Sequence, residues 1–246
     1  SCLCGLGYQP DAQACTACDT EHYKPYTGNA TCTACPSNTK TGEGGASAIT
    51  DCVCTPGFEG PAGGACTACV AGKYKDVLSS TQDCVQCPAA ATTPNTASIQ
   101  YSDCLCTAGH TIKAGTTRPP LQCEACATGK YKTALGEEDC QGCPVNTNTA
   151  GTGSDSRSLC LCDPGYVGAD PDSCTQCTAG SYKAGLGDGT CAACTPNTFS
   201  LAGASACTPC PAHSESGEGA AACVCSAGYH RVDGTCQACP AGTFKA

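Results

Sequence analysis

Thirty of the 246 residues are cysteine, and the chemistry open to the chain depends on how these thiols are spaced. Every cysteine belongs to one of two kinds of closely spaced pair. Ten pairs are Cys-x-x-Cys, at 15/18, 32/35, 66/69, 84/87, 123/126, 140/143, 174/177, 191/194, 207/210 and 236/239. Five pairs are Cys-x-Cys, at 2/4, 52/54, 104/106, 160/162 and 223/225. Pairs of this kind occur in zinc sites, in redox-active thiol proteins and in disulfide frameworks.

Zinc binding and redox chemistry fit the surrounding sequence poorly. The pairs 66/69 and 84/87 have a workable zinc spacing, but the series continues along the whole chain and lacks the nearby histidines and basic residues of zinc modules. A redox-active pair needs a βαβ context that lowers the thiol pKa at a helix N-terminus. Ten copies of one motif favour structural disulfides. We therefore expect no metal site.

Catalytic machinery is also not expected. Hydrolysis needs a nucleophile and a base held together, and histidine is the usual base. The four histidines, His22, His110, His213 and His230, occupy unrelated positions of the sequence pattern. We predict that the protein is not an enzyme, has no catalytic residues and carries no cofactor.

Composition indicates small cross-linked modules outside the cell. Aromatic residues make up 5% of the chain and tryptophan is absent, so one large apolar core is not expected. Disulfides persist in oxidising compartments, which predicts an extracellular or cell-surface location reached through the secretory pathway. The formal net charge of −9 argues against nucleic acid as a partner. No run approaches the roughly 18 apolar residues of a membrane span, so no membrane contact is expected from this segment.

The order of the cysteine pairs defines a repeated unit of six cysteines. Complete units cover 18–66, 69–123, 126–174 and 177–236, and the last contains an additional Cys-x-x-Cys at 207/210. Residues 1–15 form the C-terminal part of a unit, and 239–246 begin another. Each Cys-x-Cys is followed by a Gly-aromatic pair in all copies but one, and a Gly-x-aromatic-Lys motif recurs at Tyr74, Tyr131, Tyr182 and Phe244, with Tyr23 in a looser copy.

Local sequence predicts short hairpins. No stretch keeps a 3.6-residue apolar period, and the 30 glycines and 16 prolines interrupt nearly every ten residues. We expect two-stranded hairpins joined by irregular loops, with almost no helix. Because the aromatic residues recur at fixed positions, they should pack against the disulfides, and the stem of the lysine that follows should lie over the ring.

Two known modules are similar to the repeat. The pattern Cys-x-Cys-x-x-Gly-aromatic, followed by a cysteine about a dozen residues later, resembles the end of an EGF-like domain, best at 54–66 and 162–174. The Gly-x-Tyr-Lys, Cys-x-x-Cys-Pro and Asn-Thr segments resemble the cysteine-rich repeats of Eph-type receptors, also found in surface proteins of ciliates and algae. The resemblance implies tandem EGF-like modules in an elongated rod, each contacting its sequence neighbours.

Two disulfide schemes remain open. In the unit 69–123 the EGF pattern implies the bonds 69–87, 84–104 and 106–123, whereas pairing of successive cysteines gives 69–84, 87–104 and 106–123. Both schemes close the loop after each Cys-x-Cys, by Cys4–Cys15, Cys54–Cys66, Cys106–Cys123, Cys162–Cys174 and Cys225–Cys236. Both leave Cys2 and Cys239 without a partner in the chain. We expect these two cysteines to bond to a continuation of the array, either in a longer chain or in another copy.

Two further kinds of site occur in extracellular modules, calcium sites and N-linked glycans. An EGF-type calcium site needs acidic residues just before the first cysteine of a unit, and Glu124 alone precedes Cys126, so no calcium is expected. Asn29-Ala30-Thr31 is the only N-glycosylation sequon, which makes Asn29 the candidate for an N-linked glycan.

These features predict a structural component of an extracellular filament, coat or ciliary hair. Its expected partners are other copies of itself or flanking modules, together with other extracellular proteins and glycans. One alternative is the ligand-binding ectodomain of a receptor or adhesion protein, with the long loop 107–122, and Arg118 to Leu121 at its tip, as the contact surface. A variable surface antigen is a second alternative.

Overall fold

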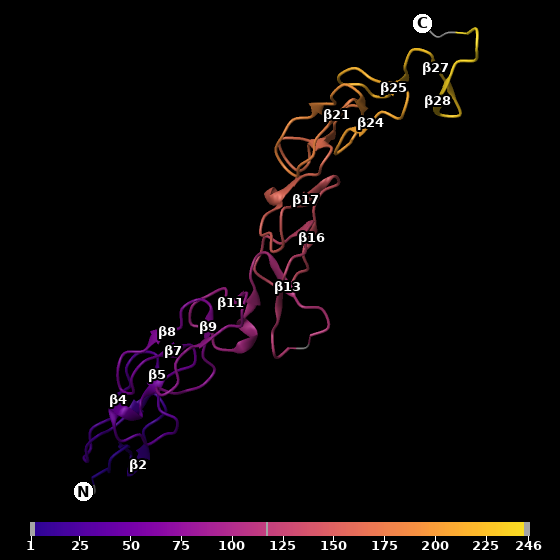
Figure 1. Cartoon of the computed structure of the whole chain (residues 1–246). Helices are drawn as coiled ribbons and strands as arrows, with labels where there is room; N and C mark the ends of the chain where they lie inside the picture. The colour runs from indigo at the N-terminus through magenta and orange to yellow at the C-terminus, as the bar shows by residue number, and fades with distance from the viewer. Residues whose placement is uncertain (1–2, 117, 244–246) are drawn as a thin grey trace. The chain divides into compact units, whose positions relative to one another are not determined.

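A computed structural model of the chain describes residues 3–116 and 118–243 (Figure 1). In this part of the chain, every strand pairs with its neighbour in sequence to form a separate two-stranded sheet. The fourteen hairpins are β1 (Tyr8–Asp11) with β2 (Ala14–Ala17), β3 (His22–Tyr23) with β4 (Thr33–Ala34), β5 (Thr39–Lys40) with β6 (Val53–Cys54), β7 (Phe58–Glu59) with β8 (Thr67–Ala68), β9 (Lys73–Tyr74) with β10 (Val85–Gln86), β11 (Ala91–Thr92) with β12 (Leu105–Cys106), β13 (His110–Ile112) with β14 (Cys123–Ala125), β15 (Lys130–Tyr131) with β16 (Gln141–Gly142), β17 (Thr147–Thr149) with β18 (Cys160–Cys162), β19 (Tyr166–Val167) with β20 (Thr175–Gln176), β21 (Ser181–Tyr182) with β22 (Ala192–Ala193), β23 (Thr198–Phe199) with β24 (Thr208–Pro209), β25 (Ser214–Glu215) with β26 (Val224–Cys225), and β27 (Tyr229–Val232) with β28 (Thr235–Ala238).

Helical structure among the described residues is limited to three short 3-10 turns. These are η1 (Ile49–Asp51), η2 (Tyr101–Asp103) and η3 (Arg157–Leu159), and each directly precedes a Cys-x-Cys. No helix in the described ranges is long and apolar enough to cross a membrane. The prediction of short hairpins with almost no helix is confirmed.

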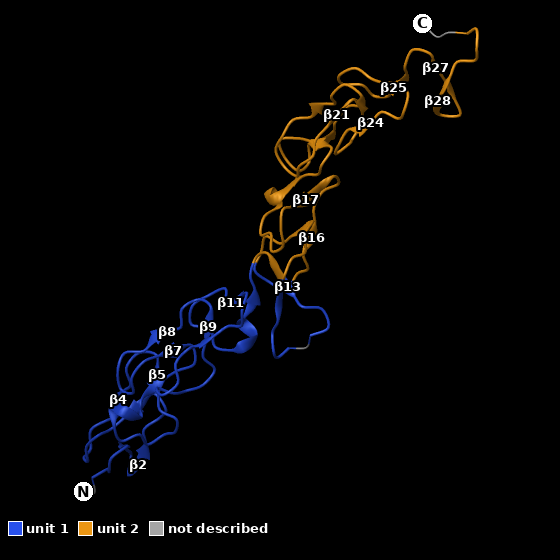
Figure 2. Ribbon diagram, viewed as in Figure 1, with its two compact units in different colours: residues 1–107, 111–124, 135–137 blue, residues 108–110, 125–134, 138–246 orange. Residues whose placement is uncertain are grey.

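The chain divides into two compact units (Figure 2). Unit 1 contains residues 1–107, 111–124 and 135–137, and unit 2 contains 108–110, 125–134 and 138–246. Each unit therefore holds two of the four complete six-cysteine repeats, except that 108–110 and 135–137 are assigned to the other unit.

Among the described residues, fourteen disulfides accompany the fourteen hairpins, and each one joins successive cysteines. The bonds are 4–15, 18–32, 35–52, 54–66, 69–84, 87–104, 106–123, 126–140, 143–160, 162–174, 177–191, 194–207, 210–223 and 225–236. The EGF-type bonds 69–87 and 84–104 are absent, so that scheme is wrong and sequential pairing holds. Each repeat is a series of consecutive disulfide-closed hairpins.

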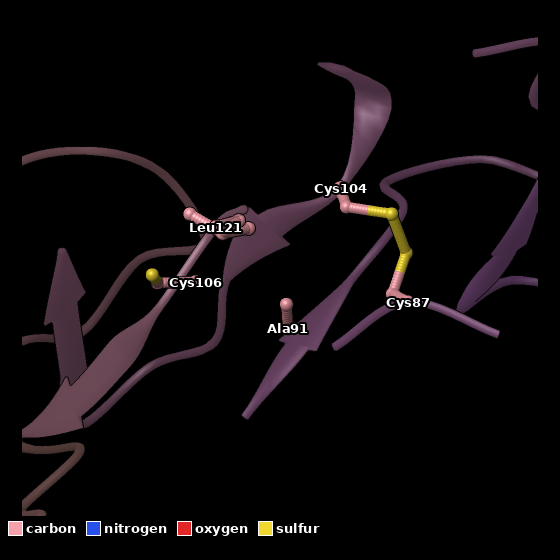
Figure 3. Packing of buried hydrophobic residues seen from close by; sticks show 5 residues of the cluster. All are labelled: Cys87, Ala91, Cys104, Cys106 and Leu121. Carbon is pink, nitrogen blue, oxygen red and sulfur yellow. A yellow bond between two sulfur atoms is a disulfide. The ribbon is translucent and has the colours of Figure 1, made fainter. Parts of the chain in front are cut away.

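Disulfide sulfur replaces the apolar core in this fold. Most buried apolar side chains are half-cystines, and Cys52, Cys54, Cys69, Cys104 and Cys106 are completely buried. A mixed cluster lies in unit 1, where Ala91 and Leu121 pack with the half-cystines 87, 104 and 106 (Figure 3). Loops of this size gain about 3 kcal/mol each from closure in the chain-entropy model, which offsets the small apolar contribution.

Candidate functional site

One arrangement recurs where each repeat follows the preceding one, and we call it the lysine junction. It consists of the glycine of a Gly-aromatic hairpin in one repeat and the lysine of the Gly-x-Tyr-Lys loop in the next. In the looser copies, His22-Tyr23-Lys24 and Gly109-His110 take these places. Each junction lies within a single unit. Within the described residues, four junctions pair Gly7 with Lys24, Gly57 with Lys75, Gly109 with Lys132, and Gly165 with Lys183.

Main-chain hydrogen bonds define the junction. At the second junction, the Gly57 amide donates to the Lys75 carbonyl at 2.8 Å, and the Cys69 amide donates to the Gly57 carbonyl at 2.8 Å. The Lys75 amide in turn donates to the Ser98 carbonyl at 3.1 Å. The equivalent bonds form at all four junctions, with lengths between 2.7 and 3.2 Å. The loop of one repeat is thus hydrogen-bonded between the hairpin before it and the loop after it.

The junction glycines cannot be replaced without strain. All four have positive φ, between +73° and +83°. A Cβ at Gly57 would lie 2.5 Å from the carbonyl oxygen of Ala97, and one at Gly165 would lie 2.1 Å from that of Gly203. Both the backbone conformation and this close main-chain approach explain why glycine recurs here.

The junction lysines are buried, although lysine is almost never fully buried without a partner. Their exposed fractions are 0% for Lys24, 0% for Lys75, 3% for Lys132 and 5% for Lys183. The burial of the lysine ammonium groups was not predicted from the sequence. The prediction placed only the aliphatic stems, over the aromatic rings. A signal for this burial was present in the sequence: a lysine follows the aromatic residue of every Gly-x-aromatic-Lys motif, in a chain with only twelve lysine and arginine residues.

Carbonyl oxygens accept the hydrogen bonds of these ammonium groups. Lys24 Nζ donates to the carbonyls of Tyr8 at 2.6 Å and Gly28 at 2.5 Å. Lys75 Nζ donates to the carbonyl of Phe58 at 2.7 Å and to that of Ser79.

The two junctions of unit 2 have similar acceptors. Lys132 Nζ donates to the His110 carbonyl at 2.9 Å. Lys183 Nζ donates to the carbonyls of Cys162 and Asp163 at 3.3 Å and Gly185 at 2.7 Å. In all four cases, at least one acceptor belongs to the preceding repeat.

Burial changes the proton affinity of two of these groups. Loss of hydration lowers the pKa of Lys75, and the negative charges of Glu59 and Asp83 oppose the shift. Burial likewise lowers the pKa of Lys132, against the opposing charge of Glu138. The cost of desolvating the charged amine explains the direction.

The structure joins the five cysteine pairs expected after each Cys-x-Cys. These are Cys4–Cys15, Cys54–Cys66, Cys106–Cys123, Cys162–Cys174 and Cys225–Cys236. Cys239 is partly exposed and forms no disulfide with the described residues. Cys2 lies outside the described residues.

The sequon and the histidines lie at separate places. Asn29 is exposed, in a bend directly after Gly28. His22 pairs with the carboxylate of Asp19 at 2.6 Å, and this hydrogen bond lowers the pKa of Asp19. His213 stacks on Tyr229 with ring centroids 4.2 Å apart. Among the described residues, no group of three or more His, Cys, Asp or Glu side chains is placed to hold a metal ion.

At the expected tip of the long loop 107–122, Pro119 and Pro120 are exposed, but Arg118 and Leu121 contact other parts of unit 1. Leu121 is only 2% exposed, within the cluster of Figure 3. Its amide donates to the Tyr101 hydroxyl. The Arg118 guanidinium donates to the carbonyl of Cys104 and to the carboxylate of Glu137. Arg118 and Leu121, two of the four residues expected at the tip of a ligand-binding loop, therefore make contacts within unit 1.

Comparison with known proteins agrees with this architecture. The family model described as tyrosine-protein kinase ephrin type A/B receptor-like matches residues 5–52, 59–104 and 110–160. The chain belongs to this family. Each matched segment contains one junction lysine, Lys24, Lys75 or Lys132. The segment 5–52 also contains the junction glycine Gly7, whereas Gly57 and Gly109 lie just before the two later segments. The junction of Lys183 forms the same main-chain bonds beyond the matched residues.

The chain is also similar to cysteine repeat modular protein A of Toxoplasma gondii. It is 28% identical over 151 residues, which cover 56% of this chain and 5% of the relative. The chain thus spans a small part of that protein's length. Together, the disulfides and the ephrin-receptor-like repeats indicate an extracellular or secreted repeat protein.

Proposed function

We propose that the chain is a structural component of an extracellular filament, coat or ciliary-hair-like assembly. The observation that carries this proposal is the repetition of one junction, with the same main-chain bonds, at Lys24, Lys75, Lys132 and Lys183. Repeats that contact each other through the same hydrogen bonds can form a long array, and such an array suits a structural role. In this proposal the chain has no catalytic role.

The proposed partners follow from the same role. They are further modules of the same kind, in a longer chain or in other copies, and other proteins and glycans outside the cell. Nucleic acid and lipid are not among them, given the net charge of −9. We also propose that Asn29 carries an N-linked glycan, since the side chain is exposed and lies in a bend.

Extraction of native source material tests the structural role. If the chain is part of an assembly, it should sediment with the coat or filament fraction in non-reducing detergent, and antibody–gold conjugates should decorate that structure in electron micrographs. Recovery of the protein as a freely diffusing species, with no labelled structure, would refute the proposal. Treatment with a glycosidase, compared with an Asn29→Gln variant, tests the glycan by electrophoretic mobility.

A second candidate function, binding of a ligand by a receptor or adhesion ectodomain, is favoured by one charged groove in unit 1. Glu21, His22, Asn38 and Lys40 line this groove, and Lys40 pairs with Glu21 at 2.9 Å. At the corresponding positions of the next repeat, Gly72 and Thr92 replace Glu21 and Lys40, so the charges belong to one repeat only.

Cell-binding assays can distinguish the two candidates. A receptor role predicts that Glu21→Gln with Lys40→Met abolishes binding to partner cells, while Lys73→Met does not. A structural role predicts that neither variant changes incorporation into the assembly.

A further inference from the structure

Four of the eleven lysine and arginine residues that the structure describes are buried. Moving an ammonium group out of water is costly, and an apolar side chain of similar length would avoid that cost. Lys24 and Lys75 are nevertheless the largest fully buried side chains among the described residues. The group at the end of the side chain must therefore contribute something that packing of the stem alone does not.

The acceptors have a common arrangement, which we call the carbonyl cradle. One side of the cradle belongs to the preceding repeat, where Phe58 supplies the carbonyl for Lys75. The other side belongs to the lysine's own repeat, where the acceptor is Ser79. The Lys24 cradle has the same composition, with Tyr8 and Gly28. The ammonium nitrogens of Lys24 and Lys75 thus bridge two repeats through neutral main-chain oxygens, and that of Lys183 does the same.

Two other positions of the chain show that a donor is what the cradle requires. In the inserted segment of the last repeat, Ser200 lies where a junction lysine would be, and its hydroxyl donates to the Ser181 carbonyl at 2.9 Å. Ser181 follows Gly180 as Phe58 follows Gly57. Ser216 repeats the arrangement, with its hydroxyl donating to the Thr198 carbonyl at 2.8 Å. Lysine and serine share a hydrogen-bond donor but neither length nor charge.

We propose that the carbonyl cradle is a binding site for a primary amine, and that the N–H donors of the lysine side chain hold each repeat on the preceding one. A primary ammonium group suits the cradle because it has three N–H donors on a small tetrahedral head, whereas a guanidinium is planar and larger. The site is occupied from within the chain. It should also accept a soluble alkylammonium ion when the lysine side chain is shortened.

Hydrogen exchange of the whole chain with native disulfides tests this role at the Lys75 junction. Lys75→Met keeps the stem and removes the donors, which leaves the carbonyls of Phe58 and Ser79 unsatisfied. We expect the amides of Gly57 and Cys69 to exchange about ten- to hundredfold faster, the range of a lost charge-assisted hydrogen bond. Lys73→Met, two residues away on β9, is the matched control and should leave these amides unchanged.

Chemical rescue tests whether the cradle binds an amine. In Lys75→Ala, n-propylammonium chloride should restore protection of the Gly57 and Cys69 amides. Tetramethylammonium chloride, which has the charge but no N–H donor, should not. Wild-type exchange rates in Lys75→Met, or no difference between the two salts in Lys75→Ala, would overturn the proposal.

Chemical labelling of the unmodified protein gives a test that no variant can spoil by misfolding. An amine-acetylating reagent should modify Lys73 and the exposed Lys40 and Lys130 rapidly, and Lys75 at least about tenfold more slowly, because its amine is hydrogen-bonded inside the junction. Equal rates for Lys73 and Lys75 would contradict the cradle. This result is independent of whether the chain belongs to a filament or to a receptor.

Discussion

The lysine junction at Lys183 and the serine junction at Ser200 lie close together in unit 2 and differ in the side chain that completes them. Their main chains are hydrogen-bonded alike. The Gly165 amide donates to the Lys183 carbonyl at 2.8 Å, and the Gly180 amide donates to the Ser200 carbonyl at 2.9 Å. A Cβ on Gly180 would lie 2.0 Å from the Gly219 carbonyl oxygen, as close as at the lysine junctions.

The difference between the two junctions separates geometry from chemistry. Because the same main-chain bonds form with either side chain, the glycine and the hairpin determine how one loop stacks on the next. The side chain adds a hydrogen-bond donor. At Lys183 the donor is a charged ammonium group on a long aliphatic stem, and at Ser200 it is a neutral hydroxyl on a short side chain. Changes to the glycine should therefore affect both junctions equally, and changes to the donor should affect them unequally.

The largest expected effect comes from the glycines. Gly165→Ala and Gly180→Ala should each destabilise their junction by about 3 kcal/mol or more, because a Cβ at positive φ would also meet a main-chain oxygen. Hydrogen exchange at the Cys177 and Cys194 amides measures the local opening free energies. Gly142→Ala is the control, since nothing lies within 4 Å of a Cβ there and no junction includes this residue. Clearly unequal losses at the two junctions would disprove the shared geometry.

The donors should give a smaller and unequal effect. Lys183→Met is expected to cost about 2 kcal/mol at the Cys177 amide, since it removes charge-assisted bonds from a buried amine to three carbonyls. Ser200→Ala removes one neutral bond and should cost about 1 kcal/mol at the Cys194 amide. Local opening free energies from native-state exchange check both values. A larger loss for Ser200→Ala would reverse the proposed ranking of the donors.

The sequence predicted the hairpins and loop closures but not what holds the repeats together. Cysteine spacing alone defined the loop after each Cys-x-Cys, because both bonding schemes agreed there. It could not choose between bonds 69–84 and 69–87, since the local spacing accommodates either. The cradles were not predicted because their acceptors are main-chain carbonyls, which every residue has. Only the fold shows that Phe58 and Ser79 place theirs on either side of Lys75.

The inserted segment illustrates a second limit. Its sequence, Cys194 to Ser200, reads CTPNTFS and matches the Pro-Asn-Thr loops such as Cys143 to Thr149. In the latter loop the Gly129 amide donates to the Thr149 hydroxyl, whereas Ser200 uses its carbonyl, as the junction lysines do. Similar sequence therefore gave different bonding, because the hairpin before it determines which groups are available.

Alkaline pH offers a milder way to distinguish the junctions. Burial lowers the pKa of Lys75 below 10.5, against the charges of Glu59 and Asp83, so the unfolded state binds more protons in the window between the two values. Stability of the Lys75 junction should therefore rise as pH increases through that window, up to 10.5. Neutral lysine still has two N–H donors for the cradle.

Tyr74, the residue before Lys75, opposes this rise in stability. Burial, Asp76 and Tyr101 raise its pKa above 10.0, so the unfolded state loses the phenolic proton first and stability falls as pH rises past 10. In Tyr74→Phe, the opening free energy at the Cys69 amide should rise with pH without that fall. Since Ser200 does not titrate, its side chain should add no such rise at the Cys194 amide. Loss of stability in the Tyr74→Phe variant over this window would contradict the assignment.

The smallest effect is expected from an exposed ion pair. It tests whether burial explains how much the junction donors contribute to the opening free energy. Arg157 donates to Asp172, and this hydrogen bond lowers the pKa of the Asp172 carboxyl although both groups are exposed to water. Its contribution is present above 3.8 and disappears as pH falls through the lowered pKa. Asp172→Asn should change the opening free energy at the Cys177 amide less than Ser200→Ala changes it at Cys194, because water competes for both partners. An equal change in opening free energy for Asp172→Asn and Ser200→Ala would show that burial does not explain the effect of the junction donors. The ranking of lysine above serine would then have to rest on charge alone.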